Sequence, residues 1–316
     1  MTSIRSGTIV ATAALLLTGA LAAQSPAGTT WDDSLTPGRN YAVAQFRLWL
    51  PAEVGRVRAA LLLVPGSNGD GRGQVADTVW QAFATRHHLA LLGLRLTDRP
   101  HDQGFIEEYV DAGAGSGQAL LDVLARFAAT SRHPELTGAP LLLWGMSAGG
   151  EFNYEFTAWR PERVIAFVVN KGNIYYHLLL SQEARAVPGM LFTGGDDLKF
   201  RRDAVAGLFA VNRRGGALWA FAEEPGAGHV VGKSRDVELP FFEDVMALRL
   251  GEAAAADGTV ALKPLTELGG WLADYTATEF VHFTAGSAPS APTAWLPSER
   301  VARAWQAMVR GTPIEH

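Results

Sequence analysis

Short, mainly apolar runs alternate with stretches of helical spacing along most of the chain. In these runs the apolar residues follow one another instead of occupying every second position, which predicts strands that are covered on both faces. Strands of this kind that alternate with helices are typical of a parallel sheet with helices on each side. The runs are residues 58–66, 88–96, 139–145, 164–172, 187–195 and 217–226.

Two segments between these runs have the spacing of amphipathic helices. Residues 116–131 predict a strong helix, with Ser116 as its N-terminal cap. Residues 74–88 predict a second helix. The expected buried faces are Leu120, Leu121, Leu124 and Phe127 in the first helix, and Val75, Val79 and Phe83 in the second.

The two ends of the chain depart from this alternation. Residues 24–40 are rich in Gly, Pro, Ser and Thr, so we expect a loop before a strand at 41–51. After residue 252 we expect a hairpin or strap around 271–283 and an amphipathic helix from Ser298. We therefore assign residues 24–252 to one domain and 253–316 to an extension packed on it. The apolar side of the last helix consists of Val301, Trp305 and Met308.

The N-terminus has the features of a secretory signal peptide. Arg5 supplies a positive charge, residues 8–21 are apolar, and Ala20-Leu21-Ala22 fits the small-residue cleavage pattern. The apolar segment is short for a membrane span, and an uncleaved anchor helix is the alternative. We assign residues 1–23 to the signal and expect a secreted or periplasmic bacterial protein, with no stable membrane insertion after cleavage.

Composition narrows the chemistry. The chain has 316 residues and no cysteine, which excludes thiol catalysis, thiolate metal sites and iron–sulfur clusters. A domain of this size needs no disulfide bonds to hold its core together. The net charge is −5 and no basic block is present, which argues against nucleic acid as a partner. No group of residues has metal-ligand spacing, so we expect no metal and no cofactor; the oligomeric state is open.

One motif lies where a strand ends and a helix begins. Residues 145–149 read Gly-Met-Ser-Ala-Gly and match G-x-S-x-G. In that context the serine lies in a tight, strained turn, and small neighbours are needed because larger side chains would collide with the strand and helix. Such a turn holds the Ser147 hydroxyl out into a cleft, near the positive end of the helix dipole.

A serine hydroxyl is a poor nucleophile without a base, and the base needs an acid to orient it. Asp196 and Asp197 follow the run at 187–195, and His229 follows the run at 217–226. The order along the chain is Ser, Asp, His. All of these residues lie on turns after strands, where ligands bind in open α/β sheets.

From about residue 55 to 250 the chain resembles the α/β-hydrolase fold. Within it, the sequence is similar to secreted serine esterases of the feruloyl esterase, polyhydroxyalkanoate depolymerase and dienelactone hydrolase-like groups. The resemblance implies an α/β fold with a mostly parallel central sheet, helices on both faces and a C-terminal appendage. It also implies Ser147 as nucleophile, His229 as general base and Asp197 as the acid, because the family's acid turn reads G-x-x-D; Asp196 is the alternative.

The resemblance further implies an oxyanion hole made of two backbone N–H groups. The N–H of Ala148, directly after the nucleophile, is one donor, and the N–H of Ser67 is the other. His101, Tyr175 and Tyr176 lie on loops that face the same edge of the sheet. These three side chains either contact the substrate or only pack.

The leading hypothesis is therefore a secreted serine hydrolase that cleaves carboxylic esters through an acyl-enzyme on Ser147. The expected substrates are feruloyl or acetyl esters of plant polysaccharides, or a polyester. One alternative is a serine peptidase of the same fold, although such peptidases usually carry a large additional domain. The other is a binding protein that kept the fold and lost catalysis.

Overall fold

The computed structural model describes residues 26–102, 104, 106–251, 260–284 and 293–314. The signal segment expected at residues 1–23 lies outside this part of the chain and stays a prediction. The described residues contain no helix that is both long enough and apolar enough to cross a lipid bilayer.

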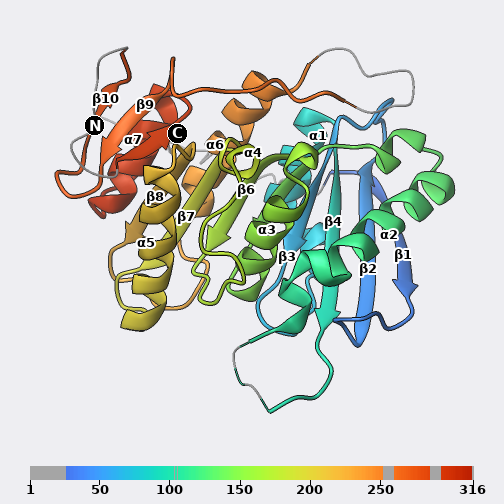
Figure 1. The fold of residues 1–316 in the computed structure, drawn as a ribbon. Coiled ribbons are helices and arrows are strands. Elements are labelled where there is room, and N and C mark those ends of the chain that lie inside the picture. Colours follow the sequence, from blue (N-terminus) through green and yellow to red (C-terminus); the bar gives the residue numbers. More distant parts are fainter. Residues whose placement is uncertain (1–25, 103, 105, 252–259, 285–292, 315–316) are drawn as a thin grey trace, which may run out of the picture.

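A large mixed sheet forms the centre of the molecule (Figure 1). Its eight strands follow the order β1-β2-β4-β3-β5-β6-β7-β8. Strands β3 to β8 run parallel to one another, whereas β2 is antiparallel to both β1 and β4. The bounds are β1 (Gly28–Leu35), β2 (Val43–Pro51), β3 (Ala59–Val64), β4 (Leu89–Thr97), β5 (Leu141–Gly145), β6 (Val164–Asn170), β7 (Gly189–Gly194) and β8 (Trp219–Glu224).

The parallel strands form where the sequence has its mainly apolar runs. Every residue of β3, β5, β6 and β7 is buried. Burial on both faces follows from the helices that cover the sheet on each side. The expectation of a large, mostly parallel sheet with helices is confirmed, with the addition of the antiparallel strands at one edge.

The prediction of a loop at residues 24–40 was wrong in part, because residues Gly28–Leu35 form the strand β1. It pairs with β2 along its whole length and forms the outer edge of the sheet. An edge strand has one solvated side, so it needs little apolar sequence. Only Trp31 and Leu35 pack against the core.

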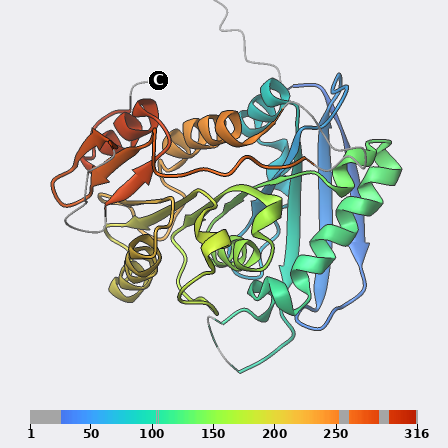
Figure 2. The same ribbon diagram turned by 45° about the horizontal axis from the view of Figure 1, so that its top comes forward.

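Helices cover both faces of the sheet. Helices α2, α3 and α5 lie on one face, and α1 and α6 lie on the other (Figures 1 and 2). The bounds are α1 (Thr78–His87), α2 (Ser116–Ser131), α3 (Ala148–Trp159), α4 (Gln182–Arg185), α5 (Lys199–Arg214) and α6 (Arg235–Arg249), with 3₁₀ turns η1 (Arg72–Ala76), η2 (Glu108–Val110), η3 (Ala112–Ala114), η4 (Pro134–Thr137) and η5 (Pro161–Arg163).

The prediction for the helix at 74–88 was confirmed in part. Val75 and Phe83 are buried as expected. Val75 belongs to the separate turn η1, however, and α1 begins only after Asp77, whose side chain accepts hydrogen bonds from the N–H groups of Val79 and Trp80. Val79 was wrongly placed in the buried face, because in the shorter helix it is 43% exposed and Trp80 is buried instead.

Helix α2 agrees with its predicted apolar face but not with its predicted cap. Leu120, Leu124 and Phe127 are buried, and Leu121 is half-buried and packs against the core. Ser116 is the first helical residue rather than the cap, which is Gly115 at a φ of 145°. The Ser116 hydroxyl is buried and donates to the Tyr109 carbonyl at 2.6 Å, so it fastens the preceding turns rather than the helix end.

The C-terminal part packs beside β8, as both ribbon views show (Figures 1 and 2). Ser298 caps α7 by accepting from the Val301 N–H, and the buried Trp305 indole donates to the Phe221 carbonyl at 2.7 Å. These contacts agree with an extension packed on the main body, while the division into domains stays a prediction. The bounds are β9 (Trp271–Asp274), β10 (Glu279–His282), β11 (Ala294–Leu296) and α7 (Glu299–Val309).

Candidate active site

Ser147 lies in the turn between β5 and α3, in a strained conformation. Its φ is 56° and its ψ is −128°, a region that side-chain-bearing residues seldom adopt. A Cβ on Gly145 would lie 2.3 Å from the Gly149 carbonyl oxygen, and a Cβ on Gly149 would lie 2.2 Å from the Val64 carbonyl oxygen. Both glycines of the motif are thus required by close backbone approach, as the sequence pattern indicated.

The neighbouring strands hold this turn in place. The Ser147 N–H donates to the Asn170 carbonyl at the end of β6, at 2.8 Å. The Met146 N–H donates to the Val64 carbonyl at the end of β3, at 3.2 Å. Backbone bonds to both sides explain how the strain at Ser147 is maintained.

His229 and Asp197 meet Ser147 at this edge of the sheet. His229 Nε2 lies 3.0 Å from Ser147 Oγ, and His229 Nδ1 lies 2.7 Å from Asp197 Oδ2. The three residues come from the turns after β5, β7 and β8. The structure therefore brings together the three side chains that the sequence pattern singled out.

The two candidate aspartates differ in their surroundings. Asp196 is exposed, whereas the Asp197 side chain is only 2% exposed. Burial alone would raise the pKa of Asp197, but hydrogen bonds from His229, the Leu198 N–H and Arg201 lower it below its ordinary value. The geometry thus favours Asp197 as the partner of His229.

The expected oxyanion donors lie next to Ser147. Ala148 is the first residue of α3, so its N–H has no partner inside the helix. A Cβ on Gly66 would lie 3.5 Å from the Ser147 Cβ, which places the backbone beside Ser67 close to the hydroxyl. Two hydrogen bonds fix the turn that contains Ser67. The Gly69 N–H donates to the Gly66 carbonyl at 2.9 Å, and the Asn68 N–H donates to the Tyr109 hydroxyl at 3.1 Å.

A cavity of about 660 Å³ opens above Ser147 and His229. Its lining includes four polar residues that the sequence interpretation missed. Two of them could have been found from the sequence. Each lies four residues after a predicted site residue at the start of a helix, and residues four apart lie on the same face of a helix. Those two are Glu151, after Ser147, and Arg201, after Asp197; the other two are Glu107 and Asn173.

His101, Tyr175 and Tyr176 are not among the residues that line this cavity. His101 Nε2 lies 3.4 Å from Asp98 Oδ2, and the residue lines a smaller adjoining hollow. The Tyr175 ring packs edge-on against Tyr154, with centroids 5.0 Å apart. Tyr176 is 45% exposed, and its hydroxyl donates to the Glu107 carbonyl at 3.3 Å.

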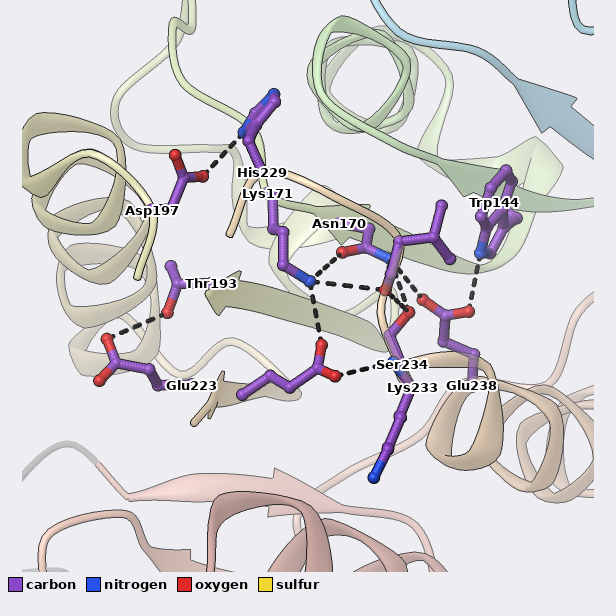
Figure 3. Close-up of polar contacts among 12 residues, drawn as sticks. Trp144, Asn170, Lys171, Thr193, Asp197, Glu223, His229, Lys233, Ser234 and Glu238 are labelled. Carbon is purple, nitrogen blue, oxygen red and sulfur yellow. Dashed lines mark hydrogen bonds and ion pairs between the residues drawn. The ribbon is translucent and has the colours of Figure 1, made fainter. Parts of the chain in front are cut away.

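A buried polar network lies behind the site (Figure 3). The Lys171 ammonium is fully buried and contacts Asn170 Oδ1 at 3.1 Å, Glu224 Oε2 at 3.2 Å and the Val231 carbonyl at 3.5 Å. Glu224 also accepts from the Lys233 N–H at 2.8 Å. These contacts join the end of β6 to residues 225–234, the loop that carries His229.

The network continues to α6. Asn170 donates to the Ser234 hydroxyl at 2.6 Å and to Glu238 at 3.4 Å, and the Trp144 indole donates to Glu238 at 2.7 Å (Figure 3). Burial raises the pKa of Glu238 to about 7, against the hydrogen bonds that lower it. The nucleophile turn, the histidine loop and α6 therefore share one set of buried contacts.

The described residues contain no group of three or more His, Cys, Asp or Glu side chains arranged to hold a metal ion.

Comparisons with known proteins bear on the fold. No protein-family model matches the sequence, and no curated protein matches it. Among solved structures, a ferulic acid esterase is similar, with a TM-score of 0.52 and 14% sequence identity over 69% of this chain and 98% of that chain. The two chains share a fold. The architecture is consistent with an α/β-hydrolase-like fold, and identity this low leaves the activity to be argued from the residues.

Proposed function

We propose that this protein is a serine hydrolase that cleaves carboxylic esters through an acyl-enzyme on Ser147. The observation that carries the proposal is the continuous chain of contacts from Ser147 Oγ to His229 and from His229 to Asp197, at 3.0 and 2.7 Å. A nucleophile in reach of a base, with the base oriented by a carboxylate, is the arrangement that acyl transfer requires.

In the proposed reaction His229 takes the proton from Ser147 as the hydroxyl oxygen attacks the ester carbonyl. The same histidine then gives that proton to the departing alcohol. Water attacks the acyl-enzyme in a second round, with His229 again as base, and the carboxylic acid leaves. Asp197 holds the imidazole in the required tautomer and stabilises its charged form.

The proposed oxyanion hole consists of the N–H groups of Ser67 and Ala148. The negative oxygen of the tetrahedral intermediate forms near the first turn of α3, where the helix dipole also favours negative charge. A donor of this kind typically contributes about 3 kcal/mol of transition-state stabilisation. No metal or cofactor takes part in this scheme.

The proposed substrates are acyl esters on polysaccharides, such as feruloyl or acetyl esters, or a polyester. The proposed location is outside the cytoplasm, secreted or periplasmic, in keeping with the predicted signal segment. Two experiments separate this proposal from a peptidase and from a binding protein. Labelling of Ser147 by a fluorophosphonate probe tests for an activated serine. Turnover of p-nitrophenyl acetate against a peptide amide tests the preference for esters.

We expect labelling and rapid ester turnover in the unmodified protein, and no labelling and only residual turnover in Ser147→Ala. Residual catalysis by such variants is typically about 10³–10⁴-fold above water, far below the enzyme itself. Ester turnover by Ser147→Ala at the unmodified rate would refute the proposal. Faster cleavage of the amide would replace it with a peptidase.

A further inference from the structure

The cavity beside Ser147 has a polar lining, which bears on what it binds. Among the described residues that line it, Met146 is the one with a large apolar side chain, whereas Glu107, Glu151, Asn173 and Arg201 are polar. Pockets for aromatic or long apolar groups are lined mainly by hydrophobic and aromatic side chains. The polar side chains of the described lining therefore favour a small acyl group over a ferulate ring or a long acyl chain.

Glu107 supplies a buried acceptor in this cavity. It is 7% exposed, and within the part of the chain that the structure describes its carboxylate has no hydrogen bond or ion pair. Its oxygens are not among the side-chain atoms that are buried without a partner, so they are open to the cavity. They can accept hydrogen bonds from the hydroxyl groups of a ligand there.

Glu151 and Arg201 supply the complementary groups. Glu151 is 3% exposed and accepts from the Asn173 N–H at 2.6 Å. Burial, and then the neighbouring charge of Glu107, raise the pKa of Glu151 to about 8, so near neutral pH its carboxyl group is protonated and can also donate. Arg201 contacts Asp197 through Nη1, while its Nε is buried and has no partner among the described residues.

These groups offer hydrogen bonds of both directions to a ligand. The guanidinium of Arg201 and the carboxylate of Glu107 have opposite charges, so the pair of them gives no excess of one sign for a charged ligand to pair with. A neutral group with several hydroxyls can donate to Glu107 and accept from Glu151 and Arg201. Sugars and other polyols have this chemistry.

The cavity beside Ser147 adjoins further space, beyond what one small acyl group would fill. A second hollow of about 360 Å³ shares Ser67 and Glu107 with it. Tyr176, which is 45% exposed, contacts the Glu107 carbonyl through its hydroxyl. A chain of more than one sugar unit has room beside the reacting ester.

We propose that the cavity beside Ser147 binds an uncharged, hydroxyl-bearing ester with a small acyl group, such as an acetylated sugar, and that Glu107 recognises its hydroxyls. This inference rests on the proposed function for the reaction at Ser147. It goes further by choosing among the expected ester classes and by naming Glu107 as a specificity residue.

Binding is tested apart from catalysis, on the Ser147→Ala protein titrated with acetylated xylobiose in a calorimeter. We expect Glu107→Gln to raise the Kd about tenfold, because a hydrogen bond to a charged acceptor is stronger than one to a neutral amide. The matched control is Glu155→Gln, a buried glutamate further along α3 that bonds to His177 instead of lining the cavity. It should leave the Kd within twofold.

Turnover by the unmodified protein gives the second readout. We expect kcat/KM for acetylated xylobiose to exceed that for methyl ferulate and for acetylcholine by at least tenfold. Preference for the ferulate or the cationic ester, or equal binding by Glu107→Gln and its parent, would overturn the inference. If no ester is turned over but binding still depends on Glu107, the proposed reaction fails while the assignment of the cavity stands.

Discussion

The contacts of single residues decide which aspartate orients His229. Asp197 places Oδ2 at 2.7 Å from Nδ1, and its other oxygen accepts from the Leu198 N–H at 2.7 Å, so the carboxylate is held from two sides. Asp196 is exposed and binds only through its backbone N–H, to the Ala227 carbonyl. The two neighbours therefore have separable roles.

Asp197→Asn should lower kcat for p-nitrophenyl acetate by about 10³–10⁴-fold, because the amide favours the wrong histidine tautomer. Asp196→Asn is the matched control and should keep kcat within about twofold, as expected for a surface substitution. Steady-state kinetics of both purified variants measure the effect. The assignment of the acid fails if the loss occurs in Asp196→Asn instead.

The buried Glu151 carboxyl group links the site to the stability of the fold. Its pKa in the folded protein is about 8, compared with an ordinary value of 4.5, because of burial and then the charge of Glu107. Between these values the folded chain keeps a proton that the unfolded chain releases. The stabilisation from this group is therefore complete below pH 4.5 and is lost as the pH rises towards 8.

Glu151→Gln should remove this dependence, because an amide does not titrate in this range. The free energy of unfolding of the variant, relative to the unmodified protein, should improve with rising pH by up to about 1.4 kcal/mol per pH unit. Urea unfolding at several pH values between 5 and 8 provides the measurement. Parallel curves for the two proteins would contradict the raised pKa.

At the scale of elements, Lys171 joins the end of β6 to the loop that carries His229. Its ammonium is fully buried against Glu224 and the Val231 carbonyl (Figure 3). Removal of one member of a buried ion pair leaves the other charge without compensation, whereas removal of both is much less costly. The pair therefore matters more as a connection than as a source of stability.

Lys171→Met should lower the free energy of unfolding by about 3–5 kcal/mol and should lower kcat, because the histidine loop loses its attachment. The double variant Lys171→Met/Glu224→Leu should be less destabilised than the sum of the single variants. Urea unfolding gives the energies of all three proteins. Additive losses would show that the two side chains do not interact.

The extent to which the sequence predicts these elements depends on how local each signal is. The strand–serine–helix turn was predicted because its signal is a short local motif, although only Gly145 is required by a backbone atom a few residues away and Gly149 is required by the distant Val64 carbonyl. Glu107 and Lys171 gave no signal, since their burial depends on segments far apart in the chain. The leader strand β1 was missed because an edge strand is stabilised mainly by its pairing with β2 rather than by apolar residues.

At the scale of the whole molecule, the described residues beyond 260 cover the β8 end of the sheet. Trp305 is fully buried, and its indole donates to the Phe221 carbonyl at 2.7 Å, while none of the described residues that line the cavity beside Ser147 lies beyond residue 229. Stability and catalysis should therefore respond separately to a substitution in this part of the chain.

Trp305→Ala should lower the free energy of unfolding by about 3–5 kcal/mol, as expected for loss of a large buried side chain. The exposed Val281→Ala should change it by less than about 0.5 kcal/mol. Measured where both variants are folded, kcat/KM for p-nitrophenyl acetate should match the unmodified protein; a loss confined to Trp305→Ala would mean that this packing also shapes the site.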